Sequence, residues 1–114
     1  MIDKSYQEDP GSPEYYCSFG NALTDQENYG KAISMYRKAL VLQPDLAVAH
    51  YNMGNALKKQ GRINEALASY LKAIDLEPNV AEPYYNMGNT FKDQGKLNEA
   101  VSCYKKAIAL RPDY

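Results

Sequence analysis

The side chains best suited to chemistry in this sequence are asparagines that recur at fixed spacing. Asn52 and Asn86 occupy one repeated position, and Asn21, Asn55 and Asn89 occupy another, three residues further along the chain. Asparagine is a mediocre helix former, so its regular return within predicted helices indicates a function. Each carboxamide carries N–H donors and an acceptor oxygen, which match the groups of a peptide bond. The series therefore predicts a ladder of amides that holds the backbone of another polypeptide.

The other reactive residue types predict no catalysis. His50 has no second histidine or cysteine at ligand spacing, so we expect no metal site. Cys17 has no histidine in its own repeat unit to activate it, and we expect both Cys17 and Cys103 to be reduced thiols. The glycines do not form a phosphate-binding run. We therefore expect no catalytic residue and no cofactor.

Length and charge exclude further classes of protein. The chain has 114 residues, which suits one domain, and a net charge of −1, which gives no reason to bind nucleic acid or an anionic membrane. No apolar run approaches the roughly 18–20 residues that cross a bilayer. The N-terminal segment lacks the apolar core of a secretory signal. We expect a cytoplasmic protein.

The asparagines belong to a pattern that returns every 34 residues. Glycines, alanines, tyrosines and prolines mark its equivalent positions: Gly20, Gly54 and Gly88; Ala32, Ala66 and Ala100; Tyr36, Tyr70 and Tyr104; Pro44, Pro78 and Pro112. A period of this length is typical of stacked supersecondary units. The sequence predicts three units, over 13–46, 47–80 and 81–114, after a flexible lead-in over 1–12.

Each unit is predicted to contain two helices. In the second unit, apolar spacing predicts a first helix over 47–60 that Gly61 ends. Asn64 is placed to cap a second helix, which Pro78 stops. The first unit has Glu27 where the other units have a glycine, and we expect this unit to fray most easily.

These positions resemble the tetratricopeptide repeat. The third unit shows the pattern in full, as Tyr84, Met87, Gly88, Phe91, Ala100, Tyr104, Ala107 and Pro112. The resemblance covers residues 13–114 and departs from the family where His50 takes an aromatic position. It implies an all-α fold, a right-handed superhelical α-solenoid of three antiparallel helix pairs.

In this family the first-helix positions face a concave groove, so the resemblance makes the asparagines a binding surface. It implies a non-catalytic protein-interaction module that holds an extended or short helical peptide. The residues expected to bind the peptide are Asn21, Tyr51, Asn52, Asn55, Lys58, Tyr85, Asn86, Asn89 and Lys92. The alternative for the asparagines that follow each glycine is that they tie neighbouring helices together.

Two narrower functions follow from related resemblances. The ladder and the segment 85–90 resemble the repeat arm of O-GlcNAc transferases, which implies a substrate-recognition arm of a larger enzyme. Co-chaperones that grip the acidic tails of heat-shock chaperones resemble this chain at Asn21 and Asn52. Those co-chaperones need basic residues at the positions of Cys17, Glu82 and Asn86, so their carboxylate clamp is broken here.

Self-association, as an assembly scaffold, is a further alternative. Repeat arrays usually finish with a polar capping helix, and here a standard unit is followed directly by Asp113 and Tyr114. We therefore expect the last helix to expose Val101, Tyr104 and Ile108. The prediction is end-to-end stacking or a dimer, and the same observation suggests a fragment of a longer array.

Overall fold

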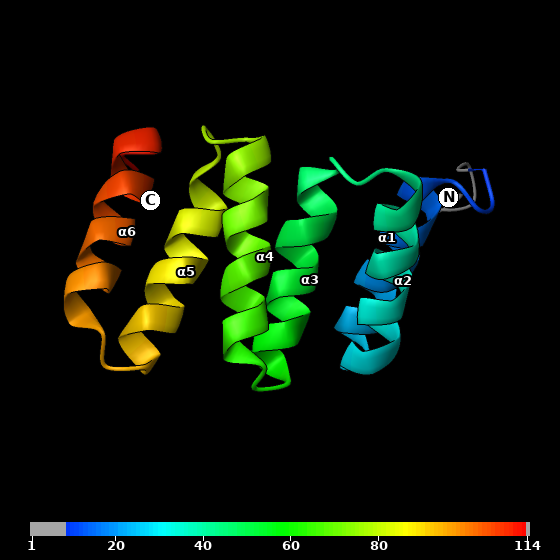
Figure 1. Ribbon diagram of the computed structural model, residues 1–114, viewed down its shortest axis with the longest axis horizontal. Coiled ribbons are helices and arrows are strands. Elements are labelled where there is room, and N and C mark those ends of the chain that lie inside the picture. Colours follow the sequence, from blue (N-terminus) through cyan, green and yellow to red (C-terminus); the bar gives the residue numbers. More distant parts are fainter. Residues whose placement is uncertain (1–8, 114) are drawn as a thin grey trace.

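A computed structural model describes residues 9–113, which form six α-helices (Figure 1). Their bounds are α1 Pro13–Asp25, α2 Tyr29–Leu42, α3 Ala47–Lys59, α4 Ile63–Leu76, α5 Ala81–Asp93 and α6 Leu97–Leu110. The helices form three antiparallel pairs, which confirms the predicted all-α fold. Within this described part of the chain, no helix has the length and apolar character that crossing a membrane requires.

The helix pairs stack into an elongated molecule of 43 × 28 × 27 Å. Each helix packs against the helices before and after it, and α3 also contacts α1 and α5. In Figure 1, α2 and α4 lie in front of α1 and α3. The first helices of successive units therefore share one side of the stack, and the second helices share the other.

Left-handed residues end the first helix of every unit. Gly61 and Gly95 have φ of 79° and 77°, a region that glycine enters without steric cost. Glu27 adopts φ 61° at the equivalent position of the first unit, so a non-glycine residue carries the strain there. The predicted cap at Asn64 is wrong. The Arg62 N–H bonds to the Leu57 carbonyl at 2.9 Å, and the chain enters α4 directly at Ile63.

Glycines in the first helices make room for tyrosine rings. A Cβ atom on Gly54 would lie 2.8 Å from the ring of Tyr70 and 3.3 Å from the carbonyl oxygen of Ala66. Gly20 stands in the same relation to Tyr36. Because no side chain fills this space, Tyr36 and Tyr70 are only 1% and 0% exposed.

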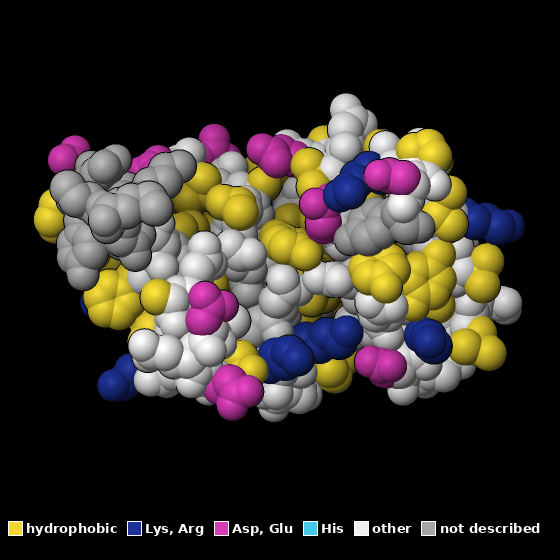
Figure 2. Space-filling view, turned by 180° about the vertical axis from the view of Figure 1, so that it is seen from behind, with side chains coloured by type: hydrophobic (Ala, Val, Ile, Leu, Met, Phe, Trp, Pro, Cys, Tyr) yellow, Lys and Arg dark blue, Asp and Glu magenta, His cyan; other side chains and the backbone are white. Residues whose placement is uncertain are grey.

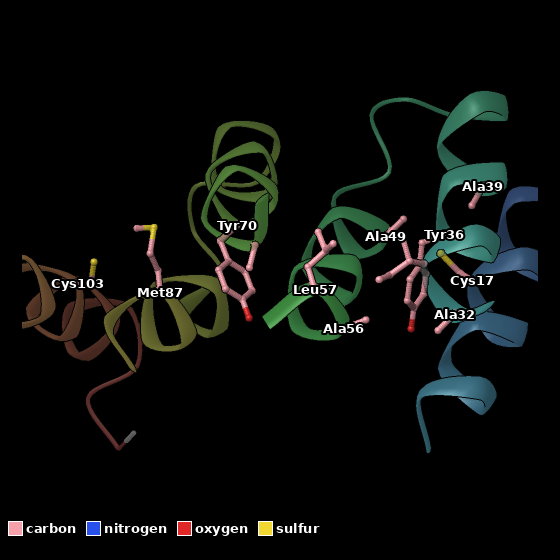
Figure 3. Packing of buried hydrophobic residues seen from close by; sticks show 12 residues of the cluster. Cys17, Ala32, Tyr36, Ala39, Ala49, Ala56, Leu57, Tyr70, Met87 and Cys103 are labelled. Atoms are coloured by element: carbon pink, nitrogen blue, oxygen red, sulfur yellow. The ribbon is translucent and has the colours of Figure 1, made fainter. Parts of the chain in front are cut away.

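The hydrophobic core runs along the stack instead of collecting at one centre. Figure 3 shows its labelled side chains in a row from Cys17 to Cys103. Alanines occupy many of the closest helix contacts, and Ala49 and Ala66 are fully buried. Each unit thus covers its apolar face with the next unit, as in other repeat proteins.

Residues 1–8 of the predicted flexible lead-in lie outside the described residues. Residues 9–12 lead directly into α1. The Ser12 Oγ accepts the backbone N–H of Tyr15 at 3.1 Å, and Pro13 occupies the first helical position. Ser12 therefore caps the helix and belongs structurally to the first unit.

Candidate functional site

The predicted amides lie on the first helices of the three units. Asn21 is on α1, Asn52 and Asn55 are on α3, and Asn86 and Asn89 are on α5. Residues three apart on a helix share a face. Because α3 contacts both α1 and α5, the asparagines of adjacent units come within reach of one another.

The amide oxygen of Asn55 joins three helices. Its Oδ1 accepts the hydroxyl of Tyr70 on α4 at 2.6 Å and the Nδ2 group of Asn86 on α5 at 2.9 Å. Asn86 Nδ2 also donates to the hydroxyl of Tyr51 at 2.8 Å. One carboxamide therefore links the two helices of its own unit to the first helix of the next.

The same bonds return in the neighbouring units. Asn21 Oδ1 accepts the Tyr36 hydroxyl at 2.7 Å and Asn52 Nδ2 at 3.1 Å. Asn89 Oδ1 accepts the hydroxyl of its own unit's tyrosine, Tyr104, at 2.5 Å. The oxygens of Asn21, Asn55 and Asn89, which follow the glycines, thus hold helices together. This agrees with the alternative that the sequence predicted for these residues.

The other half of each amide takes no part in these bonds. Among residues 9–113, no hydrogen bond uses the Nδ2 groups of Asn21, Asn55 and Asn89 or the Oδ1 atoms of Asn52 and Asn86. Asn21 is exposed and the other four are half-buried, so water or a ligand can reach them. The ladder therefore presents donors at one repeated position and acceptors at the other.

Two adjoining hollows follow this ladder. The first is lined by Asn21, Thr24, Asp25, Tyr36, Asn52 and Asn55. The second is lined by Asn55, Lys58, Lys59, Tyr70 and Asn86. Because Asn55 belongs to both, we describe them together as the groove. Figure 2 shows the molecule from behind, with hollows in the middle, acidic side chains along the upper edge and several lysine or arginine side chains in the lower half.

Lys58 lines this groove, and Tyr51 adjoins it through its hydrogen bond to Asn86. The Tyr51 ring is half-buried with its centre 6.1 Å from that of Tyr70. Lys58 Nζ lies 3.9 Å from a carboxylate oxygen of Asp93, so part of its charge is already balanced. This pair lies between α3 and α5 and therefore bridges two units.

Tyr85 and Lys92 lie apart from the groove, at the α6 end of the stack. They line an end hollow of about 400 Å³ together with Tyr104, Ala107 and Ile108. Val101 and Ile108, predicted for self-association, are 49% and 51% exposed at this end, whereas Tyr104 is half-buried. The structure thus separates Lys58, which lines the groove, from Tyr85 and Lys92, which line the end hollow.

An apolar hollow beside the groove was not predicted. It has a volume of about 180 Å³ and lies between the N-terminal ends of α3 and α5. Its lining residues are Ala47, Val48, Tyr51, Ala73, Glu77, Val80, Glu82 and Pro83. Tyr51 belongs to this hollow and also bonds to Asn86, so the apolar hollow adjoins the amide ladder.

The hydrogen bonds from the second-helix tyrosines to the asparagines were not predicted from the sequence. The tyrosine hydroxyls recur 15 residues after their asparagine partners, and this offset was a usable signal in the sequence. Burial raises the pKa of Tyr70 far above its ordinary value, and burial also raises the pKa of Tyr36. The phenols are therefore protonated donors at neutral pH, which fixes each amide with its oxygen inward.

The remaining reactive groups are held in structural positions. Cys17 and Cys103 are buried, and burial raises the pKa of Cys103, which disfavours the reactive thiolate. His50 Nε2 lies 3.0 Å from the carbonyl oxygen of Pro44. No cluster of three or more metal-binding side chains occurs within residues 9–113.

Comparisons with known proteins agree with this architecture. The family described as "TPR repeat" matches residues 20–61 and 54–95, and the family described as "Tetratricopeptide repeat" matches residues 81–114. A solved structure, "Crystal structure of MamA", is similar at a TM-score of 0.86 and 28% identity, over 92% of this chain and 61% of that chain. A second, "Crystal structure of MamA protein", gives a TM-score of 0.83 and 28% identity, over 91% and 57%.

The chain therefore spans less than two thirds of each of these structures. No curated protein sequence matches it. The comparisons give no support to the closer resemblance to the repeat arm of O-GlcNAc transferases.

Proposed function

Because the chain belongs to the tetratricopeptide repeat family, we propose that its groove binds an extended segment of another protein. Domains of this family are generally protein-interaction modules and typically lack catalysis. The proposed partner is a polypeptide whose backbone lies along α1, α3 and α5. The proposed role is to hold that segment without changing it chemically.

One observation carries this proposal: the amide ladder is bonded internally through only half of its polar atoms. The N–H groups of Asn21 and Asn55 and the oxygens of Asn52 and Asn86 face no partner among the described residues. An extended backbone offers carbonyl acceptors and N–H donors in alternation. Its groups are therefore complementary to a ladder that alternates donors with acceptors.

The apolar hollow specifies one feature of the ligand. Val48 and Val80 at this hollow are 51% and 37% exposed, and burying them would stabilise a complex through the hydrophobic effect. The hollow's volume of about 180 Å³ suits one aliphatic side chain. We therefore propose a segment in which a leucine, isoleucine or methionine lies beside the backbone held by Asn86.

The test starts from a phage-displayed library of random linear peptides selected on the wild-type protein. Selected peptides are then titrated calorimetrically against a double variant with Asn52→Ala and Asn86→Ala. A hydrogen bond contributes about 0.5–1.5 kcal/mol, so losing two acceptors should weaken binding roughly 10–100-fold.

The matched control carries Asn64→Ala and Asn98→Ala. These asparagines are exposed on α4 and α6 and make no hydrogen bond with other described residues. The control should bind the selected peptides as tightly as the wild type does. Equal affinity of the wild type and the Asn52/Asn86 variant, with unchanged circular dichroism, would refute the groove as the binding surface.

Self-association is a second candidate function, which the end face supports. Three aliphatic side chains of α6, Leu97, Val101 and Ile108, are 61%, 49% and 51% exposed. We propose that a second copy of the chain covers them. Light scattering that reports a monomer at every concentration would reject this candidate.

A further inference from the structure

We infer that the α6 end of the stack pairs with the α6 end of a second copy, which forms a closed two-fold dimer and not an open end-to-end array. The inference rests on the self-association proposed above. It specifies which surface of the second copy is the partner. The surface concerned, here called the α6 face, consists of Leu97, Val101, Tyr104 and Ile108.

The α6 face is the counterpart of surfaces that are covered elsewhere in the molecule. The equivalent residues are Tyr29, Ile33, Tyr36 and Leu40 on α2, and Ile63, Leu67, Tyr70 and Ile74 on α4. None of these side chains is exposed, because the first helix of the following unit packs over them. The α6 face therefore has the composition of an interior surface.

The opposite end of the stack does not fit onto this face. The helices that cover α2 and α4 contribute Ala49, which is fully buried, and Pro83, which is also buried. The equivalent residue of α1 is Tyr15, which packs against Phe19 with ring centres 6.2 Å apart. A phenol ring in place of a methyl group would overfill a contact built for small residues. End-to-end stacking by the internal geometry is therefore disfavoured.

The spacing of the α6 face instead suits pairing with itself. Its residues are separated by four, three and four positions, a pattern that reads the same in both directions. When two α6 helices lie antiparallel about a two-fold axis, Leu97 of one copy meets Ile108 of the other, and Val101 meets Tyr104. Such an isologous interface closes on itself at two copies.

Charge and size set the strength of this pairing. The four side chains of the α6 face are uncharged, and exposed lysines, Lys92 and Lys105, flank them. Lysines of two copies repel one another, and salt screens that repulsion. The dimer should therefore tighten as ionic strength rises. Because only a few half-exposed side chains are buried, we expect an interface near the lower limit of about 1,000 Å² and a dissociation constant of roughly 10–100 μM.

Sedimentation equilibrium from about 10 μM to 1 mM protein tests the assembly, because this range spans the expected dissociation constant. The expected result is a monomer–dimer equilibrium that saturates at two copies. Val101→Glu and Ile108→Glu should each abolish the dimer, because each would bury an unpaired charge against an uncharged side chain of the other copy. Phe19→Glu, at an exposed site on the other end, is the matched control and should leave the dimer unchanged.

Disulfide trapping then distinguishes the geometry from self-association itself. In a background with Cys17→Ala and Cys103→Ala, an equimolar mixture of Leu97→Cys and Ile108→Cys proteins should form mixed disulfides under mild oxidation. Trapping of Phe19→Cys with Ile108→Cys, or growth beyond two copies, would overturn the two-fold geometry while leaving self-association intact. A monomer at all concentrations would reject both.

Discussion

Replacing Asn55 by alanine should destabilise the protein more than the same replacement of either equivalent asparagine. Asn55→Ala removes the acceptor of the Tyr70 hydroxyl, and Tyr70 is 0% exposed. A buried donor left without a partner costs about 1–3 kcal/mol. The Asn86 amide also loses an acceptor but keeps its bond to Tyr51, so we assign that loss about 0.5 kcal/mol.

Alanine forms helices better than asparagine by up to about 0.7 kcal/mol, which offsets part of the loss. The net destabilisation should therefore be about 2 kcal/mol. Asn21→Ala should cost less than about 1 kcal/mol, because the Tyr36 hydroxyl keeps Thr24 Oγ1 as a partner at 3.2 Å. Asn89→Ala should cost similarly little, since Tyr104 is half-buried and water can replace the lost acceptor.

Urea unfolding followed by circular dichroism measures these differences, and equal slopes would show that the denatured states are comparable. A double-mutant cycle isolates the hydroxyl. Tyr70→Phe should destabilise the wild type, but it should be neutral or stabilising when Asn55 is already alanine. Equal losses at Asn21, Asn55 and Asn89, or a Tyr70→Phe effect that does not change in the Asn55→Ala background, would refute the assignment of the junction.

Three further predictions concern the backbone and the tyrosines. Gly54→Ala should destabilise the protein by about 1–3 kcal/mol although alanine favours helix, because the methyl group would meet the Tyr70 ring at 2.8 Å. Gly30→Ala is the control in the same urea assay. Its methyl group would meet only the Gln60 side chain, at 3.6 Å, so it should stabilise the protein by up to about 1 kcal/mol. Glu27→Gly should stabilise by about 1 kcal/mol, because it relieves a left-handed residue at φ 61°, and a lower unfolding midpoint would contradict this reasoning. Burial raises the pKa values of Tyr36 and Tyr70 above their unfolded value near 10, so their contribution to stability is complete below about pH 10 and is lost as the pH rises further. Phenolate absorbance at 295 nm should therefore increase together with the loss of helix, and a complete tyrosine titration in the folded protein would exclude this coupling.

The fold could be predicted from the sequence because the pattern of one helix pair recurs three times with a period of 34 residues. Gly61, Gly95 and even Glu27 mark the ends of the first helices, since few local conformations can turn the chain there. Asn64 shows where local reasoning fails: it has the chemistry of a cap, but α4 already begins at Ile63. The hydrogen bond from the Arg62 N–H to the Leu57 carbonyl fixes where α4 begins. The intrinsic preferences of single residues do not predict this bond.

The sequence predicted the positions of the asparagines at the candidate site, but not which atoms of each amide bond within the protein. Sequence spacing placed the asparagines on one face of the stack, yet which half of each amide is used internally depends on tyrosines fifteen residues later and on the next unit. The apolar hollow was missed for a related reason. Val48 and Val80 stand at opposite ends of the second unit, and their proximity depends on where α5 of the next unit begins beside α3.

The internal bonds of each amide connect the stability of the stack to the peptide binding that we propose. Tyr70 and Asn86 hold the Asn55 oxygen, so its Nδ2 group is already oriented before any ligand arrives. Immobilising a polar side chain on binding costs about 0.5–1.5 kcal/mol of conformational entropy. The asparagine side chains of this ladder are already ordered in the folded protein, so binding does not incur this loss again. The bonds that tie the asparagines into the structure therefore do not compete with ligand binding. In the complex that we propose, they make the amides effective binding groups, because a loosely held carboxamide would gain less from the same hydrogen bond.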